Sequence, residues 1–253
     1  MRYQEYQTLK IKINSGIAFV TNDHPPINLF DSVLFNDLSR FYKEVKDDYS
    51  IKVIAFNSAD PDFFIPHYDV EDILKLSEQH TTVPRNGAKL TSFNILFENY
   101  RKLSKVTMVR IDGRVGGGGN EFILALDMRF ATIGKAYFIQ PEVGLGVIPG
   151  AGGTQYLPRL MGRSRALEVI LGYQDIDALT AEKYGMVNRA LPEAEMDFFF
   201  EELAIRIASF PQEALQLAKE AVDKANTHIF DGLLEERQLF LQSVIIIRLH
   251  RIE

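Results

Sequence analysis

Four consecutive glycines at positions 116–119 limit the possible folds of this 253-residue chain more than any other feature. They follow an apolar run, residues 106–111, that predicts a buried strand. They precede a helical pattern, residues 120–128, with a start signal at Asn120. Because glycine has no side chain, a ligand can reach the main chain along this run. A strand, a glycine turn and a helix start together predict a site for a developing negative charge.

Two glutamates accompany the glycine run. Glu121 opens the predicted helix, and Glu142 follows a second apolar run, shortly before a second glycine-rich turn at residues 149–154. Two carboxylates beside such a site suit acid and base chemistry next to a carbonyl group. Each glutamate alone also has a plainer interpretation: Glu121 as a charge that satisfies the helix dipole, and Glu142 as an exposed turn carboxylate.

Other kinds of site have weaker support. The glycine run does not have the G-x-G-x-x-G pattern, and no Gly-Lys-Ser/Thr follows it, so a nucleotide cradle is not favoured. The five histidines show no metal-ligand spacing, and the absence of cysteine excludes disulfides, thiolate catalysis and cysteine-bound metals. Asp127 is interpreted as a structural partner of a backbone or arginine group.

Charge and hydropathy bear on the partners of the chain. With 28 basic and 34 acidic residues the formal net charge is −6, so non-specific attraction to nucleic acid is not expected. The N-terminus lacks the apolar core of a signal peptide, and no run approaches the roughly 18 apolar residues of a membrane helix. We therefore expect a cytoplasmic protein that binds neither nucleic acid nor a membrane. The apolar residues 244–247 are expected to form an oligomer contact.

Strand and helix patterns alternate along the chain, which predicts an α/β fold. Residues 9–13 and 17–21 predict a hairpin, and residues 71–100 predict a helix, a loop and a second helix. Further strands are predicted at residues 51–56, 130–133 and 136–139. Further helices are predicted at residues 31–45, 163–171, 196–209, 211–224 and 232–247, with one more that Thr180 caps.

A set of motifs in fixed order over roughly residues 5–240 resembles the crotonase superfamily of enoyl-CoA hydratases and isomerases. Besides the glycine run and its two glutamates, the set comprises residues 17–22 with Pro26 and Asn28, and residues 52–56, 64–70, 157–162, 166–168 and 181–188. The resemblance implies a spiral core of repeated β-β-α turns over residues 1–191 and a C-terminal helical trimerisation region over residues 192–253. It also implies an acyl-CoA thioester as substrate, and a homotrimer or a dimer of trimers.

The resemblance assigns roles to individual residues. Two main-chain N–H groups that hold the thioester oxygen fall on Tyr68 and Gly118, and the two catalytic carboxylates fall on Glu121 and Glu142. The implied substrate-binding residues are Pro66, His67, Tyr68, Asp69, Val70, Gly117 and Gly118. The family usually has Gly-Ala-Asp where this chain has His67-Tyr68-Asp69, so we expect the larger side chains to narrow the substrate channel.

We therefore expect an enoyl-CoA hydratase, a lyase that adds water reversibly to a trans-2-enoyl thioester. Glu142 would protonate the α-carbon while Glu121 activates the water. No metal or cofactor is expected, because the thioester itself is the electron sink. Two alternatives stay open: a double-bond isomerase or other crotonase-type enzyme, for which one carboxylate can suffice, and a catalytically weak acyl-CoA-binding or scaffold homologue. The second would account for the His67-Tyr68 departure and the short C-terminus.

Overall fold

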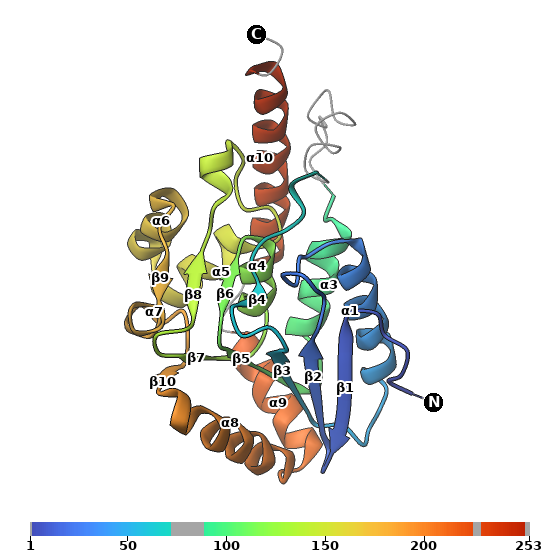
Figure 1. Ribbon diagram of the computed structural model, residues 1–253. Helices are drawn as coiled ribbons and strands as arrows, with labels where there is room; N and C mark the ends of the chain where they lie inside the picture. Colours follow the sequence, from blue (N-terminus) through green and yellow to red (C-terminus); the bar gives the residue numbers. More distant parts are fainter. Residues whose placement is uncertain (1, 72–88, 225–228, 251–253) are drawn as a thin grey trace.

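The computed structural model of the protein describes residues 2–71, 89–224 and 229–250, and its strands form two sheets (Figure 1). The larger sheet has the order β1-β2-β3-β5-β7-β10, and the smaller has the order β4-β6-β8-β9. The strands of the larger sheet are β1 (Leu9–Asn14), β2 (Ile17–Asn22), β3 (Val53–Ser58), β5 (Val106–Ile111), β7 (Met128–Thr132) and β10 (Arg189–Leu191). Those of the smaller sheet are β4 (Phe63–Ile65), β6 (Arg114–Gly116), β8 (Tyr137–Ile139) and β9 (Ile176–Asp177).

A β-β-α unit recurs along the chain, as expected for the α/β spiral. In each unit the first strand lies in the larger sheet and the second in the smaller one: β3 with β4, β5 with β6, and β7 with β8. The helices that come after these pairs are α3 (Ser92–Arg101), α4 (Gly118–Leu124) and, behind the short 3₁₀ helix η1 (Glu142–Leu145), α5 (Gly153–Met161). Because β4, β6 and β8 are parallel neighbours, the residues that follow them meet at one edge of the smaller sheet.

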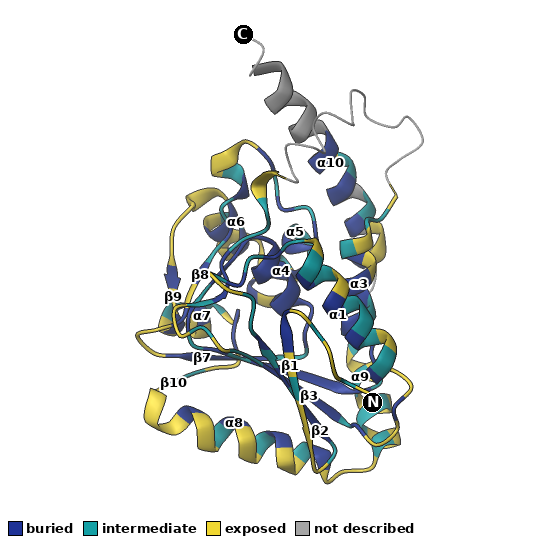
Figure 2. Cartoon of the chain, turned by 45° about the vertical axis from the view of Figure 1, so that its right-hand side comes forward, coloured by how far each residue is buried: buried dark blue, intermediate teal, exposed yellow. Residues whose placement is uncertain are grey.

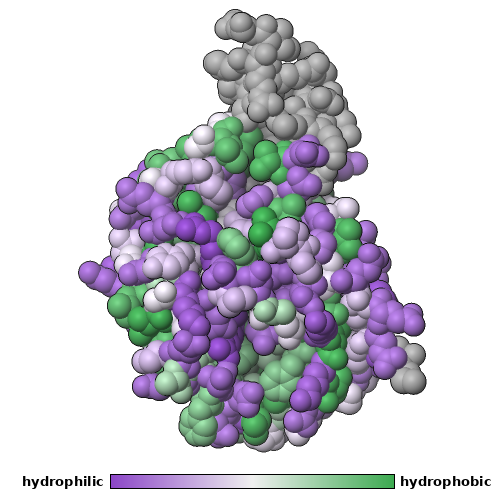
Figure 3. Space-filling view, in the orientation of Figure 1, coloured by the Kyte–Doolittle hydropathy of each residue, from purple (hydrophilic) through white to green (hydrophobic). Residues whose placement is uncertain are grey.

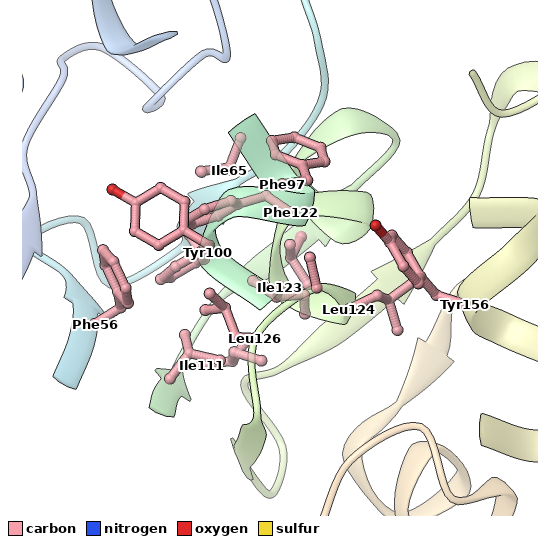
Figure 4. Close-up of a cluster of buried hydrophobic side chains, with 14 of the residues drawn as sticks. Phe56, Ile65, Phe97, Tyr100, Ile111, Phe122, Ile123, Leu124, Leu126 and Tyr156 are labelled. Carbon is pink, nitrogen blue, oxygen red and sulfur yellow. The ribbon is translucent and has the colours of Figure 1, made fainter. Parts of the chain in front are cut away.

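Helices cover both sheets and leave little of the core exposed. The other helices are α1 (Ser32–Val45), α6 (Arg163–Gly172), α7 (Ala178–Tyr184), α8 (Glu193–Ala208), α9 (Gln212–Asp223) and α10 (Ile229–His250). Helix α8 lies along the larger sheet with its inner face buried and its outer face exposed (Figure 2), because Met196 and Phe200 pack against strand residues such as Phe130. In the main core, aromatic and aliphatic side chains from α3, α4 and the strands pack around Phe122 (Figure 4). Helix α4, which carries Glu121, is therefore held on a rigid base.

Several local predictions are confirmed. Strands β1 and β2 form the antiparallel hairpin, α1 begins where Asp31 caps it through the N–H groups of Val33 and Leu34, and α3 is the second helix expected within residues 71–100. The first helix and the loop expected there lie largely outside the described residues. The division of the chain between residues 191 and 192 falls in the turn from β10 to α8, and two separate domains stay a prediction.

Two helix starts differ from the prediction. Helix α4 begins at Gly118 and ends at Leu124, instead of running from residue 120 to 128, because Gly117 takes a positive φ of 51° and turns the chain two residues earlier. The cap of α7 is Asp177 rather than Thr180, since the Asp177 carboxylate accepts the N–H of Thr180 at 2.8 Å. Within the described ranges, none of the helices is both long and apolar enough to cross a bilayer.

Candidate active site

A cavity of about 270 Å³ opens at the edge of the smaller sheet where the ends of β4, β6 and β8 meet. All four residues predicted for catalysis and oxyanion binding line it: Tyr68, Gly118, Glu121 and Glu142. The remaining wall comes from the start of α3, the second glycine turn and one side of α10, namely Thr91, Ser92, Phe93, Gly150, Ala151, Arg237 and Phe240. The topology therefore brings together residues that lie up to 172 positions apart in the sequence, from Tyr68 to Phe240.

Glu121 is buried in the first turn of α4, with 3% of its surface exposed. Its Oε1 atom accepts the N–H groups of Ala151 and Gly153, each at 2.8 Å. Burial raises the pKa of this carboxyl to about 7, and the backbone hydrogen bonds oppose that rise. A carboxyl with this pKa is divided between its two protonation states near neutral pH, as a general base requires.

Glu142 has different surroundings. It begins η1 directly after Pro141, and Gln140 donates its side-chain N–H to Oε1 at 3.0 Å. In the part of the chain that the structure describes, Oε2 is buried and accepts no hydrogen bond. Burial and the nearby charge of Glu121 raise the pKa of Glu142 well above its usual range. The pair therefore keeps a proton near neutral pH, and Glu142 is the better placed of the two to carry it.

The glycines are required by close approach as well as by backbone conformation. Gly117 has a φ of 51°, and a Cβ atom there would lie 3.1 Å from Glu142 Oε1. Gly118 is the first residue of α4, so its N–H has no partner within the helix. A Cβ atom on Gly118 would lie 3.3 Å from Tyr68 Cβ, which places the two predicted oxyanion residues side by side.

The backbone at Tyr68 is oriented by a parallel bridge to Phe30. The N–H of Phe30 donates to the carbonyl of His67 at 3.1 Å, and the N–H of Asp69 donates to the carbonyl of Phe30 at 3.1 Å. In a strand, successive N–H groups point to opposite sides, so the N–H of Tyr68 faces away from Phe30. The Tyr68 ring packs edge-on against Phe93, with ring centroids 5.2 Å apart, and thus lies against a second residue of the cavity wall.

The other predicted substrate-binding residues lie around this loop, outside the lining of the cavity. Pro66 is buried, His67 Nδ1 lies 2.9 Å from the carbonyl oxygen of Tyr68, and Asp69 accepts the N–H of Glu71 at 2.9 Å. Val70 is exposed at the surface. Their contact with a substrate, like that of Gly117, stays a prediction.

Asp127 has the structural role expected of it. Its carboxylate accepts the N–H of Thr107 at 2.7 Å and the ammonium of Lys219 at 2.6 Å. These bonds tie the start of β5 and helix α9 to the segment between α4 and β7, well apart from the cavity lining.

Sequence reasoning missed three contributors. Gln140 links Glu142 to α4, because its side-chain oxygen accepts the Asn120 side-chain N–H at 2.7 Å. The other two are Glu236 and Arg237 of α10. A signal for them was present in the sequence. An acidic and a basic residue stand next to each other in a largely apolar helix, between Leu233 and Leu241, which both face the core.

Comparison with known proteins points to one family. The family model described as enoyl-CoA hydratase/isomerase matches residues 12–244, a span that contains every residue of the cavity lining. A protein of Arabidopsis thaliana named "Probable enoyl-CoA hydratase 2, mitochondrial" is 33% identical over 231 residues, which cover 90% of this chain and 74% of that protein. The short-chain-enoyl-CoA hydratase of Clostridium acetobutylicum is 31% identical over 221 residues, covering 87% and 82%. The solved enoyl-CoA hydratase of Bacillus anthracis superposes with a TM-score of 0.76 at 26% identity and covers 91% of this chain and 90% of that one.

Proposed function

The chain belongs to the enoyl-CoA hydratase/isomerase family, and from that premise we propose that it adds water reversibly to a trans-2-enoyl thioester of coenzyme A. One observation carries the proposal: two buried glutamates with unlike surroundings, Glu121 and Glu142, line the same cavity as Gly118 and Tyr68. A hydration needs an acid and a base on one substrate, and unlike surroundings separate the two roles.

The thioester oxygen would accept hydrogen bonds from the main-chain N–H groups of Tyr68 and Gly118. Negative charge develops on this oxygen as water adds to the β-carbon, so donors fixed in advance stabilise the transition state more than the substrate. Gly118 also benefits from the position at the first turn of α4, where the helix dipole favours negative charge. The thioester accepts the electron pair itself, and we propose that no metal or redox cofactor takes part.

Glu121 would take a proton from the attacking water, and Glu142 would deliver its own proton to the α-carbon. The two N–H groups that bind Glu121 Oε1 stabilise its ionised form, which suits a base. Glu142 lacks such donors on Oε2 within the described residues and has the charge of Glu121 nearby, which favours its protonated form. In the reverse direction the same two groups exchange roles.

An ultraviolet assay tests the proposal directly. Loss of the conjugated enoyl absorbance after mixing with crotonyl-CoA or a longer trans-2-enoyl-CoA is the expected result. Migration of the double bond without hydration would identify the alternative, an isomerase that uses one carboxylate. Binding of the thioester with no turnover on any chain length would instead support a catalytically weak binding or scaffold protein.

The pH dependence follows from the pKa of Glu121. Since its pKa is raised to about 7, the carboxyl is mostly protonated below that pH and cannot accept a proton from water. We expect kcat/KM to rise about tenfold per pH unit at low pH, to level off above about pH 7, and to fall again at the higher pH where Glu142 loses the proton that it delivers. The measurement is a set of initial rates under conditions far below KM. A profile that is flat from about pH 5 to 8 would contradict the role of Glu121 as base.

We propose a homotrimer or a dimer of trimers. Leu233, Phe240 and Leu241 of α10 are buried within their own chain and are therefore not available as oligomer surface. Large apolar side chains lie exposed on α8 and α9, namely Phe198, Leu217 and Val222. On the face drawn in Figure 3, hydrophobic residues lie among hydrophilic ones in several separate groups. The side chains of residues 244–247 lie outside the described part of the chain.

Light scattering at micromolar concentration tests the oligomer. The expected mass is three or six times 28.8 kDa, the mass of one chain. Replacing Leu217 and Val222 together by glutamate should shift the protein toward monomer, because the added charges would be desolvated at an interface. A monomer in the unaltered protein would rule the trimer out.

A further inference from the structure

Arg237 is a buried cation in the wall of the candidate active site. It lies on α10, lines the same cavity as Glu121 and Glu142, and has 8% of its surface exposed. Among the residues that the structure describes, no carboxylate lies within ion-pair distance of its guanidinium, whose one recorded contact is with the ring of Phe240, 5.3 Å from the ring centroid. A guanidinium removed from water without an anion is costly, so a protein keeps one where something else supplies the anion.

The side of α10 that carries Arg237 is fixed against the cavity by its neighbours. Glu236 accepts the N–H of Thr154 at 2.9 Å and also accepts the Thr154 hydroxyl. One turn further along, the Phe240 ring packs on Gly150 so closely that a Cβ atom on this glycine would lie 2.7 Å from the ring. Arg237 lies between these two anchors, and its position in the wall is therefore determined by packing on both sides.

The acidic groups nearby do not neutralise this charge. Burial raises the pKa of Glu121 to about 7 and that of Glu236 to about 8, and the pKa of Glu142 is raised well above its usual range. Near neutral pH these carboxyls carry protons for much of the time, whereas arginine stays charged. The cavity is therefore ready for a ligand that brings a negative charge of its own.

We propose that Arg237 binds a carboxylate at the far end of the acyl group, so that the preferred substrates are enoyl thioesters whose acyl chain ends in a carboxylate. The reaction rests on the proposed function, but the recognition of the acyl group does not. The phosphates of coenzyme A are separated from the thioester by the whole pantetheine arm, whereas Arg237 shares the cavity with the two glutamates that would act at the α- and β-carbons. A planar guanidinium matches a carboxylate with two parallel hydrogen bonds.

Binding of two saturated thioesters of equal chain length, hexanoyl-CoA and adipoyl-CoA, tests the recognition without any turnover. Titration calorimetry should show that the unaltered protein binds adipoyl-CoA about 10- to 100-fold more tightly. Arg237→Met should abolish this preference while leaving the affinity for hexanoyl-CoA within about threefold, and Arg237→Lys should keep part of it. Arg159→Met, which removes an exposed arginine of α5, is the matched control and should change neither affinity.

The outcomes separate the recognition from the reaction. Equal affinity of the unaltered protein for the two thioesters would overturn the proposal, whatever the variants do. An equal loss of affinity in Arg237→Met for both thioesters and for free coenzyme A would also overturn it. Such a loss would mean that the arginine binds a phosphate of coenzyme A or supports the fold. In the kinetic arm, trans-2-hexenoyl-CoA and trans-2-hexenedioyl-CoA replace the saturated pair. If neither is hydrated while the binding preference persists, the proposed hydration fails and the recognition of a carboxylate stands.

Discussion

Glu121→Gln and Glu142→Gln should each lower the turnover of a trans-2-enoyl-CoA by about 10²–10⁴, the usual contribution of a positioned acid or base. Glutamine keeps the size of the side chain and can still accept the N–H groups of Ala151 and Gly153, or that of Gln140. It can neither take a proton from water nor give one to carbon. The fold should survive both changes, since neither residue forms an ion pair within the described part of the chain.

The measurement is kcat from the ultraviolet assay, with thermal unfolding as a check on the fold. Asp37→Asn is the matched control because Asp37 is also a buried carboxyl that accepts two backbone N–H groups, those of Gln7 and Thr8, but it is not part of the cavity lining. Its turnover should fall far less than that of the two active-site variants. Near-normal turnover in either Glu121→Gln or Glu142→Gln would refute the two-carboxylate mechanism. If only Glu142→Gln is inactive, isomerisation becomes the better proposal.

The elements predicted well from sequence are those with strong local signals. Helix α1 is one case, because Asp31 is a good cap and the apolar residues that follow it recur at helical spacing. The predicted start of α4 is wrong for a related reason. Asn120 is also a good cap residue, but the chain turns at Gly117, which has a positive φ and lies so close to Glu142, from another unit of the fold, that a Cβ atom there would be 3.1 Å from Oε1. Sequence patterns report local preference and contain no information on that approach.

The same distinction holds in the site. Glu121, Glu142, Gly118 and Tyr68 could be proposed from sequence because each lies in a motif that follows a strand, and the strands of a repeated unit place such motifs together. Arg237 could not, since its place in the cavity depends on how α10 packs on the turn before α5. Periodicity shows that a helix has a buried side, and it does not show what covers that side.

Gly118→Pro should lower kcat about 10²–10³-fold relative to Gly118→Ala, since the loss of one oxyanion donor typically has that effect. Proline removes the N–H group, and the first position of a helix is where proline fits best. Gly117, with φ 51° and ψ −127°, is not in the right-handed helical conformation that a following proline disfavours. The substitution should therefore remove the donor while α4 still forms.

The alanine variant at position 118 separates the effect of losing the N–H donor from the effect of adding a side chain. Both substitutions add a Cβ atom about 3.3 Å from Tyr68 Cβ, so both have the same close contact, but only alanine keeps the N–H. The comparison needs kcat for both variants and the affinity of each for hexanoyl-CoA, which shows that the cavity still accepts a thioester. Equal turnover of the two variants would mean that the Gly118 N–H does not hold the developing charge. A much lower kcat for the proline variant would show that the main-chain N–H of residue 118 stabilises the developing charge. The two variants differ at this position only in the proline ring, which replaces the N–H.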